Sequence, residues 1–140
     1  MPGGFASAIA RTFVIGDPCE ETKQYWNMAV SARNLIAQNA KPGVTVKGLM
    51  DLFREKILAP AGLEESSENQ IYGIGTGISE APRNIDSTRD VPLAEGMTLV
   101  IAPVIRPEGK DPYCIGDVFV ITKDGAERLN RTSSELYVLK

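Results

Sequence analysis

Residues 73–82 read Gly73-Ile74-Gly75-Thr76-Gly77-Ile78-Ser79-Glu80-Ala81-Pro82, a glycine-rich turn followed by a short polar motif. The glycines suggest a dinucleotide-binding loop, but Ile78 stands where the third glycine of such a loop belongs, and Pro82 argues against a helix beginning there. A Ser-His-Asp triad is excluded because the 140 residues contain no histidine, which such a triad needs as its base. The stretch must therefore be interpreted together with the blocks of sequence around it.

Four blocks of sequence, in this order, are similar to the motifs of one family. Residues 4–13 resemble G-Y-x-x-D-I-x-R-T-F, and residues 72–82 resemble H-G-I-G followed by H-E-x-P. Residues 93–103 resemble L-x-x-G-M-x-x-x-x-E-P, and residues 115–129 resemble I-E-D-x-x-x-V-T-x-x-G-x-E-x-L. Any one block arises easily by chance, but four in the right order do not. Together they resemble the pita-bread metallopeptidases, which include creatinase, methionine aminopeptidase and Xaa-Pro dipeptidase.

The resemblance implies a two-metal site whose ligand positions are changed in this chain. The ligand aspartate of the first block is Ala8, the first histidine of the second block is Tyr72, and the bridging glutamate of the third block is Ala102. The ligand glutamate of the fourth block is Gly116, and a further family aspartate would lie upstream of Met1. A two-metal site needs carboxylates and imidazole, and alanine and glycine offer no donor atom. We therefore expect no metal, no other cofactor and no peptidase activity.

The same positions outline a candidate ligand-binding cleft. The second family histidine, which contacts substrate, is Ser79 here, and the acidic residues beside the changed positions are retained as Glu80 and Asp117. The smaller replacements predict an apolar pocket in which a few polar groups orient a new ligand. The cleft candidates are Ala8, Tyr72, Ser79, Glu80, Ala102, Gly116 and Asp117, and the catalytic candidates among them are Tyr72, Glu80 and Asp117.

The two acidic residues allow two interpretations. Glu80 and Asp117 can hold turns or pair with nearby arginines, for which Arg11, Arg83 and Arg106 are the candidates. Alternatively, a carboxylate buried in the cleft has a raised pKa and serves as a general acid or base. The sequence leaves both interpretations open.

Three classes of function remain. The favoured class is a metal-free, peptidase-inactive relative, a pseudoenzyme that binds a small molecule or peptide in the former active-site cleft. The second is an enzyme with new metal-independent chemistry, such as a cyclase, isomerase or lyase, that acts mainly by positioning its substrate. The third is half of a split peptidase. It is the least favoured because a partner would supply only the ligands of the first half of the domain.

Composition predicts one globular domain over residues 1–140. With 43% hydrophobic residues, 24% charged residues and a formal net charge of −3, the chain resembles a folded domain more than a disordered tail. The acidic balance disfavours nucleic acid as a partner. No apolar run has the length of a membrane span, and residues 1–4 lack the features of a signal peptide. We therefore predict a cytoplasmic protein with neither nucleic-acid nor membrane partners.

Hydrophobic periodicity predicts an α+β order of elements. Asp17, Pro18 and Glu20 form a capping-box signal for a helix that runs to about Asn39 and buries Trp26. Thr45 is expected to cap a second helix that ends near residue 60. Strands are predicted over residues 5–15, 71–78, 97–105 and 113–122, with a polar loop over 64–70.

The resemblance covers one of the two α+β halves of a pita-bread domain. It implies a truncated pita-bread (creatinase/aminopeptidase-like) fold of the α+β class, with an antiparallel sheet packed by two main helices. One layer of helices cannot cover both faces of a sheet, so apolar residues within 97–101 and 118–121 are expected to need a partner. Either a second copy or another protein can provide this cover. Twofold assemblies are the commonest kind, so we favour a homodimer over another oligomer or a different partner.

Overall fold

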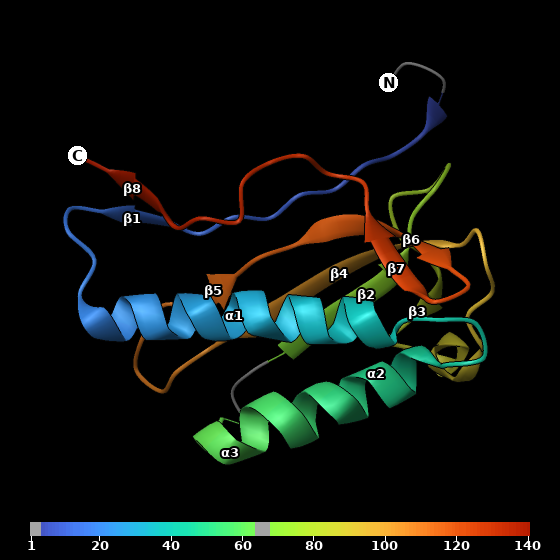
Figure 1. Cartoon of the computed structure of the whole chain (residues 1–140), viewed down its shortest axis with the longest axis horizontal. Coiled ribbons are helices and arrows are strands. Elements are labelled where there is room, and N and C mark those ends of the chain that lie inside the picture. Colours follow the sequence, from blue (N-terminus) through green and yellow to red (C-terminus); the bar gives the residue numbers. More distant parts are fainter. Residues whose placement is uncertain (1–3, 64–67) are drawn as a thin grey trace.

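The computed structural model describes residues 4–63 and 68–140, arranged as an antiparallel sheet packed by two main helices (Figure 1). The main sheet runs β3-β2-β4-β6-β7, with β5 pairing with β4, and β1 forms a separate parallel pair with β8. In chain order the elements are β1 (Phe13–Ile15), α1 (Glu20–Asn39), α2 (Val46–Phe53), the π-helical turn η2 (Arg54–Leu58), α3 (Ala59–Ala61), β2 (Glu68–Gly73), β3 (Glu80–Arg83), the 3-10 turn η3 (Ser87–Asp90), β4 (Thr98–Ile105), β5 (Tyr113–Cys114), β6 (Asp117–Thr122), β7 (Gly125–Arg128) and β8 (Tyr137–Leu139). The predicted α+β class is confirmed.

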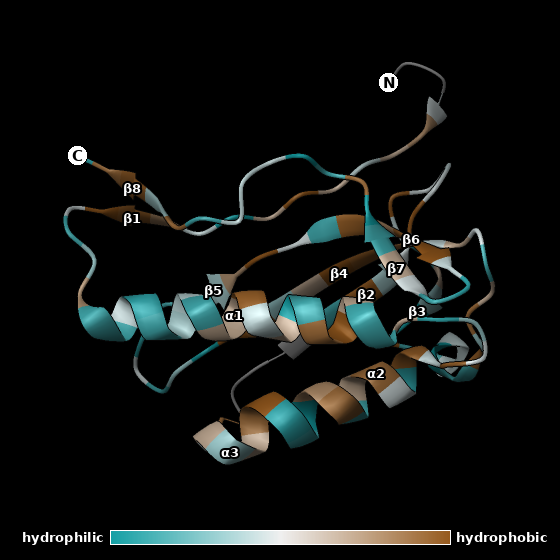
Figure 2. Cartoon of the chain, viewed as in Figure 1, coloured by the Kyte–Doolittle hydropathy of each residue, from teal (hydrophilic) through white to brown (hydrophobic). Residues whose placement is uncertain are grey.

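One face of the main sheet packs against α1 and α2. Side chains alternate between the two faces of a strand, and Leu99, Ile101, Phe119 and Ile121 all point toward the helices and are buried. Trp26 of α1 is buried in the same core, as predicted. Figure 2 shows apolar residues along β4, which lies behind α1 in this view, and on the short strands β1 and β8. This core fixes the sheet from which the candidate site is built.

The opposite face of the sheet is covered by the N-terminal segment, residues 5–10. Val100, Ala102 and Val118 point to this side and are only 3–5% exposed, with Ala6 and Ala8 packed against them. The expectation that β4 and β6 present an uncovered apolar face is therefore wrong for the single chain. The homodimer stays a prediction, but this reason for it is removed.

The start of the first helix differs from the prediction. The helix begins at Glu20 with Cys19 as its N-cap, and no side chain caps it, so the capping box at Asp17 is not formed. Glu20 and Glu21 place negative charge in the first turn, where the helix dipole favours it. The second cap is confirmed, because the Thr45 hydroxyl accepts a hydrogen bond from the Gly48 N–H at 3.1 Å.

Several predicted strand boundaries are also wrong. The strand predicted at 71–78 ends at Gly73, and the one predicted at 113–122 is divided into β5 and β6. Only residues 13–15 of the strand predicted at 5–15 form a ladder, because the segment before them makes a single bridge, at Ala10, to Gly116. Residues 68–70 of the predicted polar loop belong to β2, and residues 64–67 of that loop lie outside the described residues. In the part of the chain that the structure describes, no helix has the length and apolarity to cross a membrane.

Candidate functional site

The changed ligand positions meet on the face of the sheet covered by residues 5–10. Tyr72 of β2 and Ala102 of β4 lie in one apolar cluster, and Ala8 packs against it from the N-terminal segment. Gly116, which directly precedes β6, is bridged to Ala10 by backbone hydrogen bonds of 3.0 Å in both directions. The structure thus brings together residues that are widely separated in the chain, and we refer to Ala8, Tyr72, Ala102 and Gly116 as the ligand-position cluster.

The ligand-position cluster does not fit the metal pair that the family implies. A Cβ atom on Gly116 would lie 2.8 Å from the Cβ of Ala102 and 3.1 Å from that of Ala10, which is closer than carbon atoms normally pack. The alanines carry no donor atom, and the Tyr72 phenol is a poor ligand in its neutral form. Among residues 4–63 and 68–140, no three His, Cys, Asp or Glu side chains gather closely enough to hold a metal ion. No step of chemistry through a metal follows from these residues.

Glu80 is engaged in the glycine-rich turn. Its carboxylate accepts hydrogen bonds from the backbone N–H of Gly77 and, at 3.2 Å, from the hydroxyl of Thr76. A Cβ atom on Gly77 would lie 3.0 Å from this carboxylate, and one on Gly75 would lie 3.2 Å from it. The glycines therefore allow the carboxylate to sit inside the turn. Of the two interpretations of Glu80, this geometry matches the one in which it holds a turn.

Asp117 lies on the other side of the sheet, facing α1. It follows Gly116 directly, and neighbouring residues of a strand point to opposite faces. Its side chain is fully buried and accepts hydrogen bonds from Arg11 at 2.8 Å and from Arg33 at 2.5 Å. Pairing with Arg11 was one of the two interpretations. The structure thus places Asp117 apart from the ligand-position cluster, as part of a buried ion pair.

A pocket of about 290 Å³ opens beside Tyr72 and Ser79. Burial, with a smaller contribution from the nearby Cys114, raises the pKa of the Tyr72 phenol, which therefore stays protonated at neutral pH and can donate a hydrogen bond. The rim is apolar, with Ile78 and Ile85 strongly exposed. The pocket is lined by Gln70, Tyr72, Ile78, Ser79, Arg83, Asn84 and Ile85.

Arg83 brings a positive charge to this pocket. Its Nη2 pairs with Asp86 at 2.5 Å, whereas its Nε is buried and has no hydrogen-bond partner among the described residues. The sequence suggested Arg83 only as a partner for an acidic residue, and it did not single out Gln70, Asn84 or Ile85. The sequence could have indicated Arg83 as a site residue through its position, because it directly follows the polar motif that ends at Pro82.

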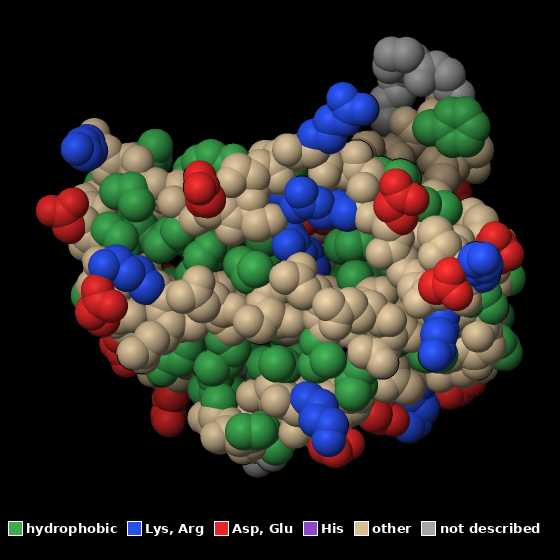
Figure 3. Space-filling view, viewed as in Figure 1, with side chains coloured by type: hydrophobic (Ala, Val, Ile, Leu, Met, Phe, Trp, Pro, Cys, Tyr) green, Lys and Arg blue, Asp and Glu red, His purple; other side chains and the backbone are tan. Residues whose placement is uncertain are grey.

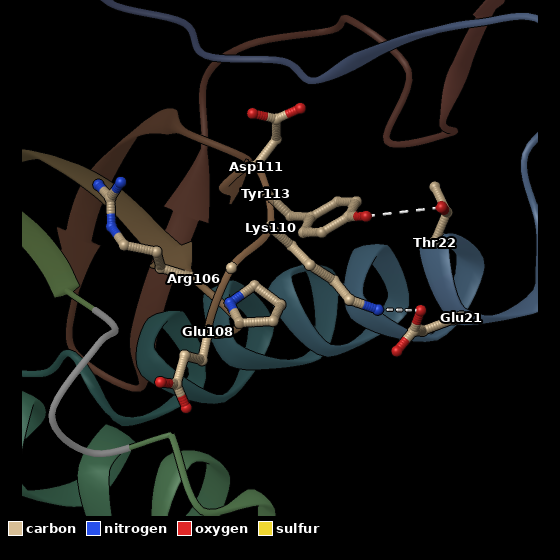
Figure 4. A pocket seen from close by; sticks show the side chains of 9 residues that line it. Glu21, Thr22, Arg106, Glu108, Lys110, Asp111 and Tyr113 are labelled. Atoms are coloured by element: carbon tan, nitrogen blue, oxygen red, sulfur yellow. Dashed lines mark hydrogen bonds and ion pairs between the residues drawn. The ribbon is translucent and has the colours of Figure 1, made fainter.

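A larger cavity, of about 570 Å³, lies between the start of α1 and the loop from Arg106 to Tyr113 (Figure 4). The Lys110 ammonium group pairs with Glu21, and the Tyr113 hydroxyl lies 3.5 Å from that of Thr22. None of the residues that the sequence predicts for the site lines this cavity. The smaller pocket beside Tyr72 is therefore the better candidate.

Comparison with known proteins agrees with the motifs. The sequence pattern of metallopeptidase family M24 matches residues 2–123. The chain belongs to metallopeptidase family M24. Among M24 relatives, the Xaa-Pro dipeptidase of Pyrococcus horikoshii is 34% identical over 133 residues, which are 94% of this chain and 37% of that protein. The Xaa-Pro dipeptidase of Lactobacillus delbrueckii subsp. lactis is 36% identical over 140 residues, and the match covers 38% of that protein.

Solved M24 structures have the same fold. The X-Pro aminopeptidase from Thermotoga maritima superposes with a TM-score of 0.87 at 29% identity, over 97% of this chain and 38% of that one. The prolidase from Pyrococcus furiosus gives a TM-score of 0.83 at 32% identity, over 94% and 39% of the two chains. The predicted pita-bread family is confirmed. The chain spans less than two fifths of the length of these M24 proteins.

Proposed function

We propose that this M24 chain binds a small polar molecule or short peptide in the pocket beside Tyr72, without a metal ion and without peptidase activity. One observation carries the proposal. Ala102 and Gly116 pack so closely that not even a methyl group fits at Gly116, while a pocket remains open next to the cluster at Tyr72 and Ser79. Packed side chains therefore occupy the former metal positions, and the adjoining pocket has room for a ligand.

The pocket lining favours a ligand that carries a carboxylate. The Arg83 guanidinium already pairs with Asp86, but its buried Nε lacks a partner among the described residues, and such a donor gains most from a charged acceptor. The Tyr72 phenol adds a neutral donor, and Ile78 and Ile85 offer apolar contact. The volume is at the lower end of the roughly 300–1,000 Å³ typical of ligand pockets, which suits an amino acid or dipeptide.

The first expected result concerns metal and peptide cleavage. Elemental analysis of the purified protein should find no stoichiometric zinc, manganese or cobalt, because Ala8, Ala102 and Gly116 offer no donor atoms. The protein should leave Xaa-Pro dipeptides and N-terminal methionine uncleaved, with the Pyrococcus furiosus prolidase assayed in parallel as the active control for the dipeptides. One or more tightly bound metal ions per chain would contradict the proposal.

The second expected result concerns the ligand. In an NMR screen of amino acids, dipeptides and small carboxylic acids, at least one compound should shift the backbone signals of residues 70–85. Arg83→Gln should weaken its binding about tenfold or more, since a hydrogen bond to a charged group is worth about 1.5–3 kcal/mol. Arg89→Gln, which removes an exposed arginine outside the pocket, serves as the matched control. Equal binding to wild type and Arg83→Gln would refute the role of Arg83.

A metal-independent enzyme is the second candidate, and the position of the Tyr72 phenol in the pocket favours it. A neutral phenol in the pocket can act as a general acid, whereas Glu80 and Asp117 already have partners in the fold. Once a ligand is known, the Tyr72→Phe variant distinguishes the two candidate functions. Turnover that falls by about two orders of magnitude while binding is retained would indicate an enzyme. Absence of turnover in the wild type would leave the binding function.

A further inference from the structure

Three arginines surround the buried carboxylate of Asp117, on the side of the sheet away from the proposed pocket. Arg11 comes from the N-terminal segment, Arg33 from α1 and Arg128 from β7, and their nearest nitrogens lie 2.8, 2.5 and 3.8 Å from the carboxylate. The side chains of Arg11 and Arg33 are only 5% exposed. We call Arg11, Arg33 and Arg128 the arginine cluster.

The arginine cluster carries more positive charge than Asp117 neutralises. Three guanidinium groups face one carboxylate, which leaves a surplus of two positive charges. The acceptors other than Asp117 that these arginines contact are neutral: Arg33 donates to the side chain of Asn34, and Arg11 donates to the backbone carbonyls of Ala10, Gly116, Thr132 and Ser133. These bonds satisfy the N–H groups but leave the net charge unchanged. Buried charge without a counter-charge is costly.

The surplus positive charge affects the pKa of Arg33. Burial lowers the pKa of its guanidinium group, the carboxylate of Asp117 opposes that change, and the neighbouring Arg128 and Arg11 lower the pKa further. Each of the two neighbouring cations therefore makes the charged form of Arg33 less favourable. A second anion at this place would act in the same direction as Asp117.

Two members of the cluster converge on one hydroxyl group. Ser134 Oγ accepts hydrogen bonds from Nη1 of Arg33 at 3.0 Å and from Nη1 of Arg128 at 2.9 Å. Arg128 is one third exposed, and in the described part of the chain its Nε and Nη2 have no partner. Figure 3 shows basic side chains gathered in a hollow between α1 and the terminal segments. Solvent anions can therefore reach the place where the two guanidinium groups meet.

We propose that the arginine cluster and Ser134 form a binding site for an oxyanion, either a phosphate or a carboxylate group. Guanidinium groups recognise both through paired N–H donors, and the Ser134 hydroxyl can turn to donate as a third. The anion offsets the surplus positive charge and holds residues 132–134 against α1 and β7. This proposal is independent of the function proposed above, because the two sites share no residue.

Thermal unfolding of the whole chain tests the site. Increasing inorganic phosphate, or acetate in a second series, with ionic strength held constant by sodium chloride, should raise the midpoint temperature in a saturable way because the anion binds only the folded state. Equilibrium dialysis with radiolabelled phosphate should give one bound anion per chain. Arg128→Gln and Ser134→Ala should each weaken phosphate binding about tenfold. Lys123→Gln, an exposed charge removal on the β6–β7 turn, should not.

Each outcome of these experiments either supports or overturns the oxyanion site. Saturation by phosphate alone assigns a phosphate-bearing ligand, and saturation by acetate as well assigns oxyanions in general; both support the site. An absence of saturable stabilisation by either anion overturns it. A rise in midpoint that is the same in wild type, Arg128→Gln and Ser134→Ala also overturns it, because the effect would then be a general effect of salt on stability.

Discussion

Asp117→Ala is expected to lower the free energy of unfolding by about 3–5 kcal/mol, because it removes one partner of a buried ion pair and leaves the other charges uncompensated. The carboxylate is fully buried and accepts hydrogen bonds from Arg11 and Arg33. Small domains are stable by only about 5–15 kcal/mol, so the variant should be largely unfolded or unfold at a much lower urea concentration. Urea titration followed by the fluorescence of the buried Trp26 measures the change.

Two further variants identify the cause of this loss. Asp124→Ala removes an exposed carboxylate from the β6–β7 turn and should change stability by no more than about 0.5 kcal/mol. Asp117→Asn keeps an oxygen acceptor of similar shape but removes the charge. A loss close to that of Asp117→Ala would show that the missing negative charge among the arginines is the main cause of the destabilisation. A loss below about 1 kcal/mol for Asp117→Ala would contradict the role given to this ion pair.

The motifs predicted which of the changed ligand positions lie together in the fold. Ala8, Tyr72 and Ala102 are far apart in the chain, yet they pack together because motif positions in a shared fold have fixed positions in space. Gly116 joins them across the bridge to Ala10. Strand periodicity likewise located β4 and β6, whose alternating apolar residues are buried on both faces of the sheet.

The orientations of the retained acidic residues were harder to predict. Asp117 and Gly116 are neighbours, and the two-residue period of a strand already implies that they point to opposite sides, so this signal was present in the sequence. For Glu80 there was no comparable signal, because its direction depends on how a glycine-rich turn folds back. The cover provided by residues 5–10 was not the favoured expectation, since an apolar extended segment and an apolar strand share the same composition and the segment was predicted as a strand.

Gly116→Glu restores the side chain that the family resemblance places at this position, and we expect it to unfold the chain rather than rebuild a metal site. The first added carbon would lie 2.8 Å from the Cβ of Ala102 and 3.1 Å from that of Ala10. Overpacking of this kind costs about 1–3 kcal/mol, and an unpaired carboxylate in an apolar cluster adds several kcal/mol more. Circular dichroism and urea titration should therefore show loss of the folded state.

Smaller substitutions isolate the steric part of this effect. Gly116→Ala should lose about 1–3 kcal/mol, and adding Ala102→Gly should recover part of the loss because it removes the atom in closest contact. Gly48→Ala in α2 is the matched control: outside its own helix backbone and chain neighbours, the nearest atom lies 3.5 Å from the added carbon, and alanine favours a helix, so stability should stay equal or rise. If Gly116→Ala is as stable as wild type, the cluster can open to admit a side chain. If Gly116→Glu folds and binds a metal ion, the chain retains enough of the family's site for metal chemistry, and the metal-free function proposed for it is wrong.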